Sequence, residues 1–333
     1  MYSKIYDFCK VKNLGNCFRN GENPTPRVNF IIDLCDQMGL KYELDTFSDS
    51  KSNIEDNMTT MRDFRYIVDT LSPDKRKEAL DLYKEFQQKV EDLDSDFEES
   101  GLENDDDAID FHEEQYYELE DEYSEKLKAI AGDIKRGVNN YFNIVLPGSS
   151  DKFVVAHHDI VNKDSDNAND NSCSVINALM IKKLRPEVNV VILDGEEFGG
   201  IGSNHLAQRI KAGDFKCKWV LNLELTGKGG KSFFVGAMGT PLTDWIANRF
   251  ECPIVNVPFN DSVIFKKYGI NSTVINPLPV TEEKSPVVNK DGEYLNFKML
   301  FNCHKMTDSV DTIDPSDMEE FVNEVCLKII DEA

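Results

Sequence analysis

The sequence lacks long apolar runs, paired cysteines and any excess of positive charge. Its 333 residues include 37 Lys and Arg against 61 Asp and Glu, a formal net charge of -24. This charge disfavours nucleic acid or an anionic membrane as a partner, because the phosphates would repel it. No run approaches the roughly 20 apolar residues that span a bilayer, and the first residues lack the apolar core of a secretion signal. The eight cysteines form no CxxC pair, which is typical of reduced thiols. We therefore expect a cytoplasmic protein, in the host cytoplasm if the chain is viral.

Negative charge is concentrated between residues 51 and 136. This segment holds 27 acidic and 12 basic side chains, and from Glu91 to Glu125 there are 18 acidic residues and no Lys or Arg. Apolar residues recur there at helical spacing and predict an antiparallel helical hairpin. The two apolar stripes comprise Ala79, Tyr83, Phe86, Val90, Leu93 and Phe97, and then Ile109, Tyr116, Leu119, Tyr123, Leu127, Ile130 and Ile134. We interpret residues 51–136 as a module inserted between two parts of another domain, residues 1–50 and 137–333. The simplest interpretation is a packed pair of helices with solvated acidic faces, but the module could also cap a cleft, form a dimer contact or bind a basic partner.

The rest of the chain alternates strand-like and helix-like segments. The patterns predict strands over residues 41–47, 141–146, 152–160, 188–193, 219–225 and 273–276, and helices over residues 27–39, 172–184, 201–212, 240–250 and 315–331. A Pro-Gly pair at 147–148 predicts a hairpin between the second and third strands. The alternation predicts an α/β fold whose sheet is covered by helices on both faces. In such sheets, ligands bind at the strand ends.

Histidines and carboxylates follow several of these strands. His157 and Asp159 end one strand, and because residues two apart point to the same side, Asp159 can brace His157. Glu196 and Glu197 follow the apolar strand, where adjacent carboxylates are costly unless a cation neutralises them. The further candidates along the chain are Asp170, Glu224 and His304. These nitrogen and oxygen ligands suit zinc, and a shared carboxylate allows two ions about 3.5–4 Å apart.

The order of these blocks resembles that of the co-catalytic zinc exopeptidases of the bacterial and vacuolar aminopeptidase type. That family also contains glutaminyl cyclase and glutamate carboxypeptidase. The matching segments are VVAHHDIV, NANDNSCSV, VILDGEEFGGIGSNHLA, LNLELTG and FNCHKMTDSVDTID. The resemblance extends over residues 19–47 and most of 137–333, but not over 51–136. It implies a three-layer αβα sandwich with a twisted mixed sheet.

The resemblance implies a role for each candidate residue. Two zinc ions per chain would be held by five ligands: His157 and Glu224 at one ion, Glu197 and His304 at the other, and Asp170 between them. Glu196 would be the general base that takes a proton from the metal-bridging water. Asp159 would orient His157. Two Zn²⁺ ions facing four carboxylates would leave the cluster close to neutral.

Several positions depart from the family pattern. Glu224 stands where the family usually has Asp, and its additional methylene can shift the ligand without preventing binding. His158 stands where Tyr is common and could compete as a ligand. Asp261 and Ser262 replace the common Asp-His of a specificity loop, which affects substrate recognition more than metal binding.

The resemblance implies a zinc-dependent aminopeptidase that hydrolyses the N-terminal bond of a peptide with a free amino terminus. Glutaminyl cyclase, carboxypeptidase and dipeptidase activities on the same fold are alternatives. Cyclases usually have Trp before the last His, whereas Cys303 precedes His304 here. An alternative of another class is a catalytically silent peptidase-like protein that binds a partner through the acidic helices. We expect a peptide substrate, no nucleic acid and no membrane, and a homo-oligomer or protein partner bound through residues 51–136.

Overall fold

The computed structural model describes residues 2–11, 24–48, 59–61, 64–68, 71–100, 106–132, 140–161, 165–257 and 259–333. The chain divides into two compact units. We call Met1–Asp49 with Asn139–Ala333 the α/β unit and Ser50–Val138 the helical unit. Within the described residues, no helix has both the length and the apolar character needed to cross a membrane.

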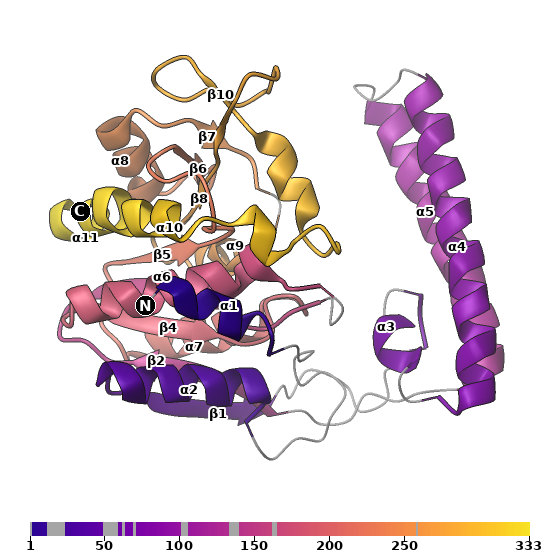
Figure 1. The fold of residues 1–333 in the computed structure, drawn as a ribbon, viewed down its shortest axis with the longest axis horizontal. Helices are drawn as coiled ribbons and strands as arrows, with labels where there is room; N and C mark the ends of the chain where they lie inside the picture. Colours follow the sequence, from indigo (N-terminus) through magenta and orange to yellow (C-terminus); the bar gives the residue numbers. More distant parts are fainter. Residues whose placement is uncertain are drawn as a thin grey trace. The chain divides into compact units, whose positions relative to one another are not determined.

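The α/β unit is built on an eight-stranded mixed sheet (Figure 1). Across the sheet the order is β1 (Glu43–Ser48), β2 (Asn140–Leu146), β4 (Asn189–Leu193), β3 (Lys152–His157), β5 (Trp219–Leu223), β8 (Ser272–Pro277), β6 (Phe233–Gly236) and β7 (Ile254–Val255). The central strands β4, β3, β5 and β8 are parallel to one another. Strands β2 and β6 pair antiparallel with this group, and β1 pairs antiparallel with β2. A separate ladder joins β9 (Val280–Thr281) and β10 (Tyr294–Leu295).

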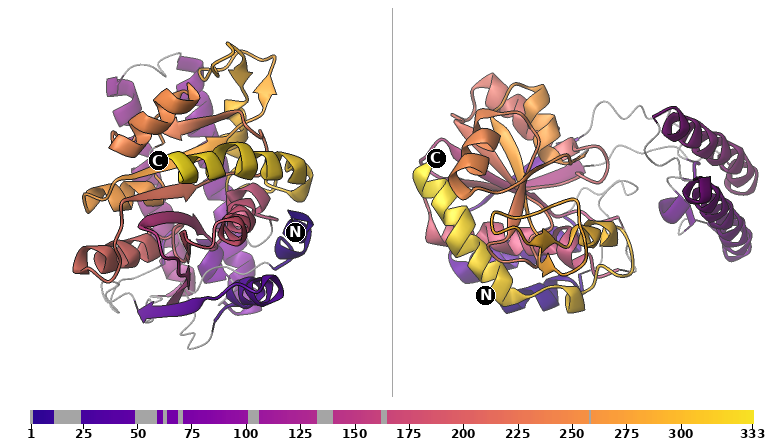
Figure 2. Two further views of the ribbon diagram at one scale, coloured as in Figure 1. Left: turned by 90° about the vertical axis from the view of Figure 1, so that its left-hand side faces the viewer. Right: turned by 90° about the horizontal axis from the view of Figure 1, so that it is seen from above.

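Helices lie on both sides of the sheet, which gives three layers (Figure 2). One face is covered by α1 (Ile5–Phe8), α2 (Pro26–Met38), α6 (Cys173–Leu184), α8 (Pro241–Phe250), α10 (Pro315–Phe321) and α11 (Leu327–Glu332). The other is covered by α7 (Ile201–Ala212) and α9 (Asp261–Lys267). Strand β3 shows why both faces are buried: Val154 and Ala156 pack into the first core, whereas Phe153 and Val155 pack into the second. The predicted αβα sandwich with a mixed sheet is confirmed.

Three helices of this unit begin with the same local signal. The side chains of Thr25, Thr240 and Asp314 each accept a hydrogen bond from a backbone N–H of the first turn, and proline occupies the first helical position. Such caps satisfy backbone donors that have no partner within the helix, and proline loses nothing there. Helix α2 ends at Gly39 in the left-handed conformation, which glycine adopts without steric cost.

The hairpin predicted around Pro147 and Gly148 is wrong. Strand β4 lies between β2 and β3 and pairs with both. The Gly148 N–H donates to Asn189 Oδ1, so the turn is attached to the start of β4 rather than closing a hairpin. All five residues of β4 are buried, and a strand that is apolar on both faces is stable in the middle of a sheet. The local turn signal carried no information about this inserted strand.

The helical unit contains α3 (Phe64–Ile67), α4 (Pro73–Ser100) and α5 (Asp106–Ala131). Its core consists of Met61, Phe64, Ile67, Val68, Ala79, Phe86, Tyr123 and Leu127. The Tyr123 hydroxyl donates to Glu85 Oε1 at 2.6 Å, and His112 Nε2 lies 3.0 Å from Asp94 Oδ1. The first contact joins the later part of α5 to the middle of α4, and the second joins the early part of α5 to the later part of α4, so the two long helices run antiparallel.

Candidate metal centre

The parallel strands bring the predicted site residues to one edge of the sheet. His157 is the last residue of β3 and stands opposite Leu193, the last residue of β4. Glu196 and Glu197 follow β4, and Glu224 directly follows β5. Parallel pairing therefore places side chains that are distant in sequence at the same end of neighbouring strands.

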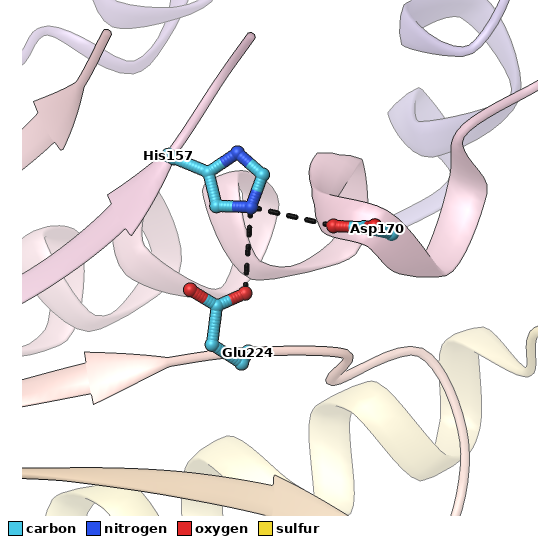
Figure 3. A group of neighbouring side chains, drawn as sticks. All are labelled: His157, Asp170 and Glu224. Carbon is cyan, nitrogen blue, oxygen red and sulfur yellow. Dashed lines mark ion pairs between the residues drawn. The ribbon is translucent and has the colours of Figure 1, made fainter. Parts of the chain in front are cut away.

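His157, Asp170 and Glu224 form a first group of possible metal ligands (Figure 3). His157 Nε2 lies 3.3 Å from Asp170 Oδ1 and 3.4 Å from Glu224 Oε2. One ligand atom from each of the three residues lies within 4.8 Å of the others. All three residues are buried, and they come from β3, the turn Ala168–Ser172 and the end of β5.

A second group consists of Asp170, Glu197 and His304. His304 Nε2 lies 2.9 Å from Glu197 Oε2 and 3.4 Å from Asp170 Oδ2. Asp170 therefore directs one carboxylate oxygen toward each histidine. A third group combines His157 with Glu196 and Glu197. The structure thus brings together the five predicted ligands and the predicted general base.

Burial makes this carboxylate cluster electrostatically costly in the absence of a cation. Burial raises the pKa of Glu196 and Glu197 well above the ordinary value, and repulsion from neighbouring carboxylates raises both further. Glu197 Oε1 is also buried without a hydrogen-bond partner among the described residues. A divalent cation would neutralise these charges and occupy that oxygen, so the donor set fits a metal.

Asp159 connects the two strand ends. Its carboxylate accepts the backbone N–H of Glu196 at 3.2 Å and of Glu197 at 3.0 Å. Its Oδ1 also lies 3.3 Å from His157 Nδ1. Asp159 therefore holds the loop after β4 as well as the imidazole at the end of β3. The sequence pattern predicted only the contact with His157.

Asp308 is a site residue to which the sequence analysis assigned no role. Its two carboxylate oxygens accept the backbone N–H groups of Asn169 at 2.8 Å and Asp170 at 3.0 Å. Burial raises the pKa of Asp308 to about 7. Asp308 falls within FNCHKMTDSVDTID, but the pattern could not show that its carboxylate would hold the turn of Asp170.

Two residues noted as departures lie beside the ligand groups. His158 is buried, and its Nε2 lies 3.2 Å from the carbonyl oxygen of Phe142 and 3.8 Å from Asp194 Oδ1. The three ligand groups do not include it, and burial lowers its pKa to about 4. Asp261 begins α9 and is buried, which raises its pKa to about 7, while the nearby charge of His157 opposes that shift. His158 is therefore directed toward the backbone of β2, whereas Asp261 interacts electrostatically with His157 and Glu224.

A cavity of about 370 Å³ opens beside the two ligand groups. Its walls are largely apolar and include Leu225, Phe234, Val257, Phe259, Phe297, Leu300 and Phe301. Phe259 and Phe301 are exposed by 48% and 61%. These residues come from several separate segments, which is why the sequence patterns did not identify them as a group.

A histidine–carboxylate centre at the parallel strand ends of a mixed α/β sandwich can hold metal ions that activate water for hydrolysis. The chain matches peptidase family M28 over residues 143–329, which is more than half of its length. The chain belongs to this family, and the resemblance noted from the sequence is confirmed.

Solved structures share the fold at low sequence identity. The glutaminyl cyclase of Porphyromonas gingivalis is 11% identical, with a TM-score of 0.55 over 100% of this chain and 97% of that one. An aminopeptidase from Aneurinibacillus sp. strain AM-1 is 12% identical, with a TM-score of 0.53 over 96% and 90%. BSAP, a zinc aminopeptidase from Bacillus subtilis, is 18% identical, with a TM-score of 0.44, and the match covers 62% of this chain and 55% of that one. This chain thus spans about half the length of that aminopeptidase. A search of curated protein sequences finds no match.

Proposed function

We propose that the protein is a zinc-dependent aminopeptidase. The observation that carries this proposal is a pair of ligand groups that share Asp170 beside an apolar cavity. In the proposed site, His157 and Glu224 would hold one zinc ion, Glu197 and His304 would hold the other, and Asp170 would contribute to both. Family membership supports a peptide substrate. The imidazole nitrogens and carboxylate oxygens match the ligands that zinc takes in proteins.

Bound zinc would supply the Lewis acidity that polarises the scissile carbonyl and lowers the pKa of the attacking water. The chain's own contribution is a base close to that position. Glu196 Oε2 lies 3.9 Å from His157 Nε2, so its carboxylate borders the first ligand group. Burial raises the pKa of Glu196 in the absence of a cation, and a carboxylate at this position can accept a proton from a water beside the ligand group. We assign Glu196 as the general base and Asp159 as the residue that orients His157.

The charges around the cavity favour a substrate with a free amino terminus. Four carboxylates border the cavity, from Asp170, Glu196, Glu197 and Glu224, and the described lining residues include no Lys or Arg. A carboxypeptidase substrate would bring its own carboxylate to this site and find no Lys or Arg among the described lining residues. Bound zinc would offset the charge of the four carboxylates, but their oxygens could still accept hydrogen bonds from an N-terminal amine. The apolar wall then accommodates the side chain of an apolar N-terminal residue.

The test is a panel of aminoacyl-aminomethylcoumarins, assayed with added zinc beside a Glu196→Gln control. We expect the fastest release for large apolar residues. In the control, kcat should fall by about 10²–10⁴-fold, because the base is lost while all five ligands remain. Cyclisation of an N-terminal glutaminyl peptide would be measured in parallel. Cyclisation without hydrolysis would replace the proposal with a cyclase, and absence of activity from zinc-loaded protein towards every aminoacyl substrate would contradict it.

A further inference from the structure

Arg27 is a buried cation of the α/β unit that the proposed function leaves without a role. It lies in the first turn of α2, and only 1% of its surface is exposed. Its guanidinium carbon lies 4.1 Å from the centroid of the Phe8 ring. A buried charge is costly unless its surroundings compensate for it. The contacts of Arg27 must therefore offset the cost of burying its charge.

The guanidinium group donates hydrogen bonds to three separate segments of the chain. Nε donates to the carbonyl oxygen of His158 at 2.7 Å. Nη2 donates to Ser172 Oγ at 2.9 Å, and Nη1 donates to the carbonyl oxygen of Val11 at 3.1 Å. The planar guanidinium group directs its donors along fixed directions from three separate nitrogens, whereas the donors of a lysine ammonium group all diverge from one nitrogen.

Two of these acceptors belong to residues that lie next to proposed ligands in the chain. His158 directly follows His157, and Ser172 lies two residues after Asp170. Ser172 Oγ donates in turn to the carbonyl oxygen of Asn167 at 2.7 Å, at the other side of the Asp170 turn. Arg27 therefore links the end of β3 to the turn that places Asp170 Oδ1 3.3 Å from His157 Nε2.

The electrostatic compensation for Arg27 also comes from the site. Its three hydrogen bonds go to two carbonyl oxygens and one hydroxyl. Its charge interacts with Asp159, whose carboxylate contacts His157 and accepts two backbone N–H groups of the loop after β4.

We propose that Arg27 is a positioning residue of the metal centre, whose guanidinium group holds the strand end of His157 against the turn of Asp170. The proposal rests on the proposed function for the identity of the metal. It predicts that loss of the fork weakens zinc binding. Outer partners that orient ligands typically contribute about 10–100-fold to metal affinity.

Lys182 provides a matched control for the loss of a buried cation. It is also buried, and its ammonium group donates to the carbonyl oxygens of Pro147, Pro186 and Val188 at 2.7, 2.7 and 2.8 Å. These carbonyls lie after β2 and before β4, at the opposite end of β4 from Glu196. Removal of Lys182 should therefore affect stability without affecting the arrangement of the ligands.

The experiment measures the Zn²⁺ dissociation constant of the full chain by competition with a chromophoric chelator, together with the melting temperature. The variants are Arg27→Gln, Arg27→Lys, Ser172→Ala and Lys182→Met. We expect zinc binding to weaken by about 10–100-fold in Arg27→Gln, and by smaller factors in Arg27→Lys and Ser172→Ala. Lys182→Met should lower the melting temperature and keep the zinc affinity of the wild type.

Two results would overturn the positioning role. One is wild-type zinc affinity in Arg27→Gln. The other is that Arg27→Gln and Lys182→Met lose the same zinc affinity and the same melting temperature. If Arg27→Gln does not fold, wild-type affinity in both Arg27→Lys and Ser172→Ala overturns it. A wild-type protein that binds no zinc overturns the proposed function as well, which distinguishes the two failures.

Discussion

Two sets of acidic side chains, one on α5 of the helical unit and one at the strand ends of the α/β unit, occupy opposite environments. In the helical unit, Glu114, Glu118 and Asp121 are exposed on α5, where water solvates each carboxylate. In the α/β unit, Glu196 and Glu224 are buried at strand ends, and burial raises the pKa of both. The density of acidic residues is highest where the carboxylates are solvated. The comparison teaches that burial, and not local composition, identifies the carboxylates that can hold a metal.

The largest expected effect separates a ligand from a solvated carboxylate. In Asp170→Asn, one residue of both ligand groups is lost, so we expect zinc binding to weaken by more than about 100-fold, beyond the loss typical of outer partners. The matched variant Asp121→Asn changes an exposed carboxylate of α5. It should keep its zinc affinity and change the free energy of unfolding by no more than about 0.5 kcal/mol. Zinc affinity is measured by chelator competition. Equal zinc affinities in the two variants would contradict the assignment of Asp170 as a metal ligand.

Asp308→Ala should have the next largest effect. The substitution removes the acceptors of two N–H groups in the turn of Asp170, so the bridging carboxylate loses its support. We expect about tenfold weaker zinc binding. The control is Asp331→Asn, which removes a surface ion pair with Arg185 at 2.6 Å and should leave zinc binding unchanged. Wild-type zinc affinity in Asp308→Ala would show that the turn holds Asp170 without it.

Val257→Trp tests the apolar side of the cavity. The larger ring fills space that an N-terminal side chain would occupy. We expect kcat/KM for a phenylalanyl substrate to fall by about tenfold relative to an alanyl substrate, because misfit of a few atoms costs that much in an apolar pocket. Val288→Trp, at a partly exposed position that does not line the cavity, is the control. A parallel loss for both substrates in Val257→Trp would indicate general disruption instead of altered specificity.

The smallest effect on zinc binding is expected when the helical unit is removed. Ser48 and Asn140 are paired across β1 and β2, and Ser48 Oγ donates to Asn140 Oδ1 at 2.8 Å. The chain therefore leaves the sheet after Ser48 and returns to it at the neighbouring Asn140. A short hairpin linker can replace residues 50–138 at small entropic cost. We expect the shortened chain to fold and keep its zinc content. Loss of zinc would show that the centre depends on the helical unit.

The same shortened chain tests the hypothesis that the inserted segment caps the cleft or forms a dimer contact. That hypothesis predicts a changed peptide preference in the aminoacyl panel, or a changed mass by light scattering. If the peptide preference and the mass both stay as in the full chain, the segment serves neither purpose. The simplest interpretation, packed helices with solvated faces, then gains support.

Much of the fold was predictable from local signals. Helix α7 occupies Ile201–Ala212, which are the bounds that the apolar spacing predicted, and β4 is the buried strand that the run at 188–193 indicated. Short elements were missed: β6 has four residues and β7 has two, too few for a periodic pattern. The order of β2, β4 and β3 was missed because the turn between β2 and β3 does not show that β4 lies between them.

Some residues of the candidate site were likewise predictable from local patterns, and others were not. The residues next to strand ends, such as His157 and Glu224, could be selected because parallel strands gather their ends. Asp308 and Arg27 could not, because they act on backbone groups 138 and 131 positions away in the sequence. Contacts of that kind depend on the assembled fold and leave no periodic trace in the chain.

The most direct test of the central claim is the zinc content of the purified protein, measured by native mass spectrometry before and after chelation, together with the melting temperature of each form. The claim is that the buried carboxylates of the α/β unit form a centre for two zinc ions. It predicts two zinc ions per chain and a lower melting temperature after their removal, because the buried charges then lose their compensation. A chain that binds no zinc, and melts at the same temperature with and without chelator, would contradict it.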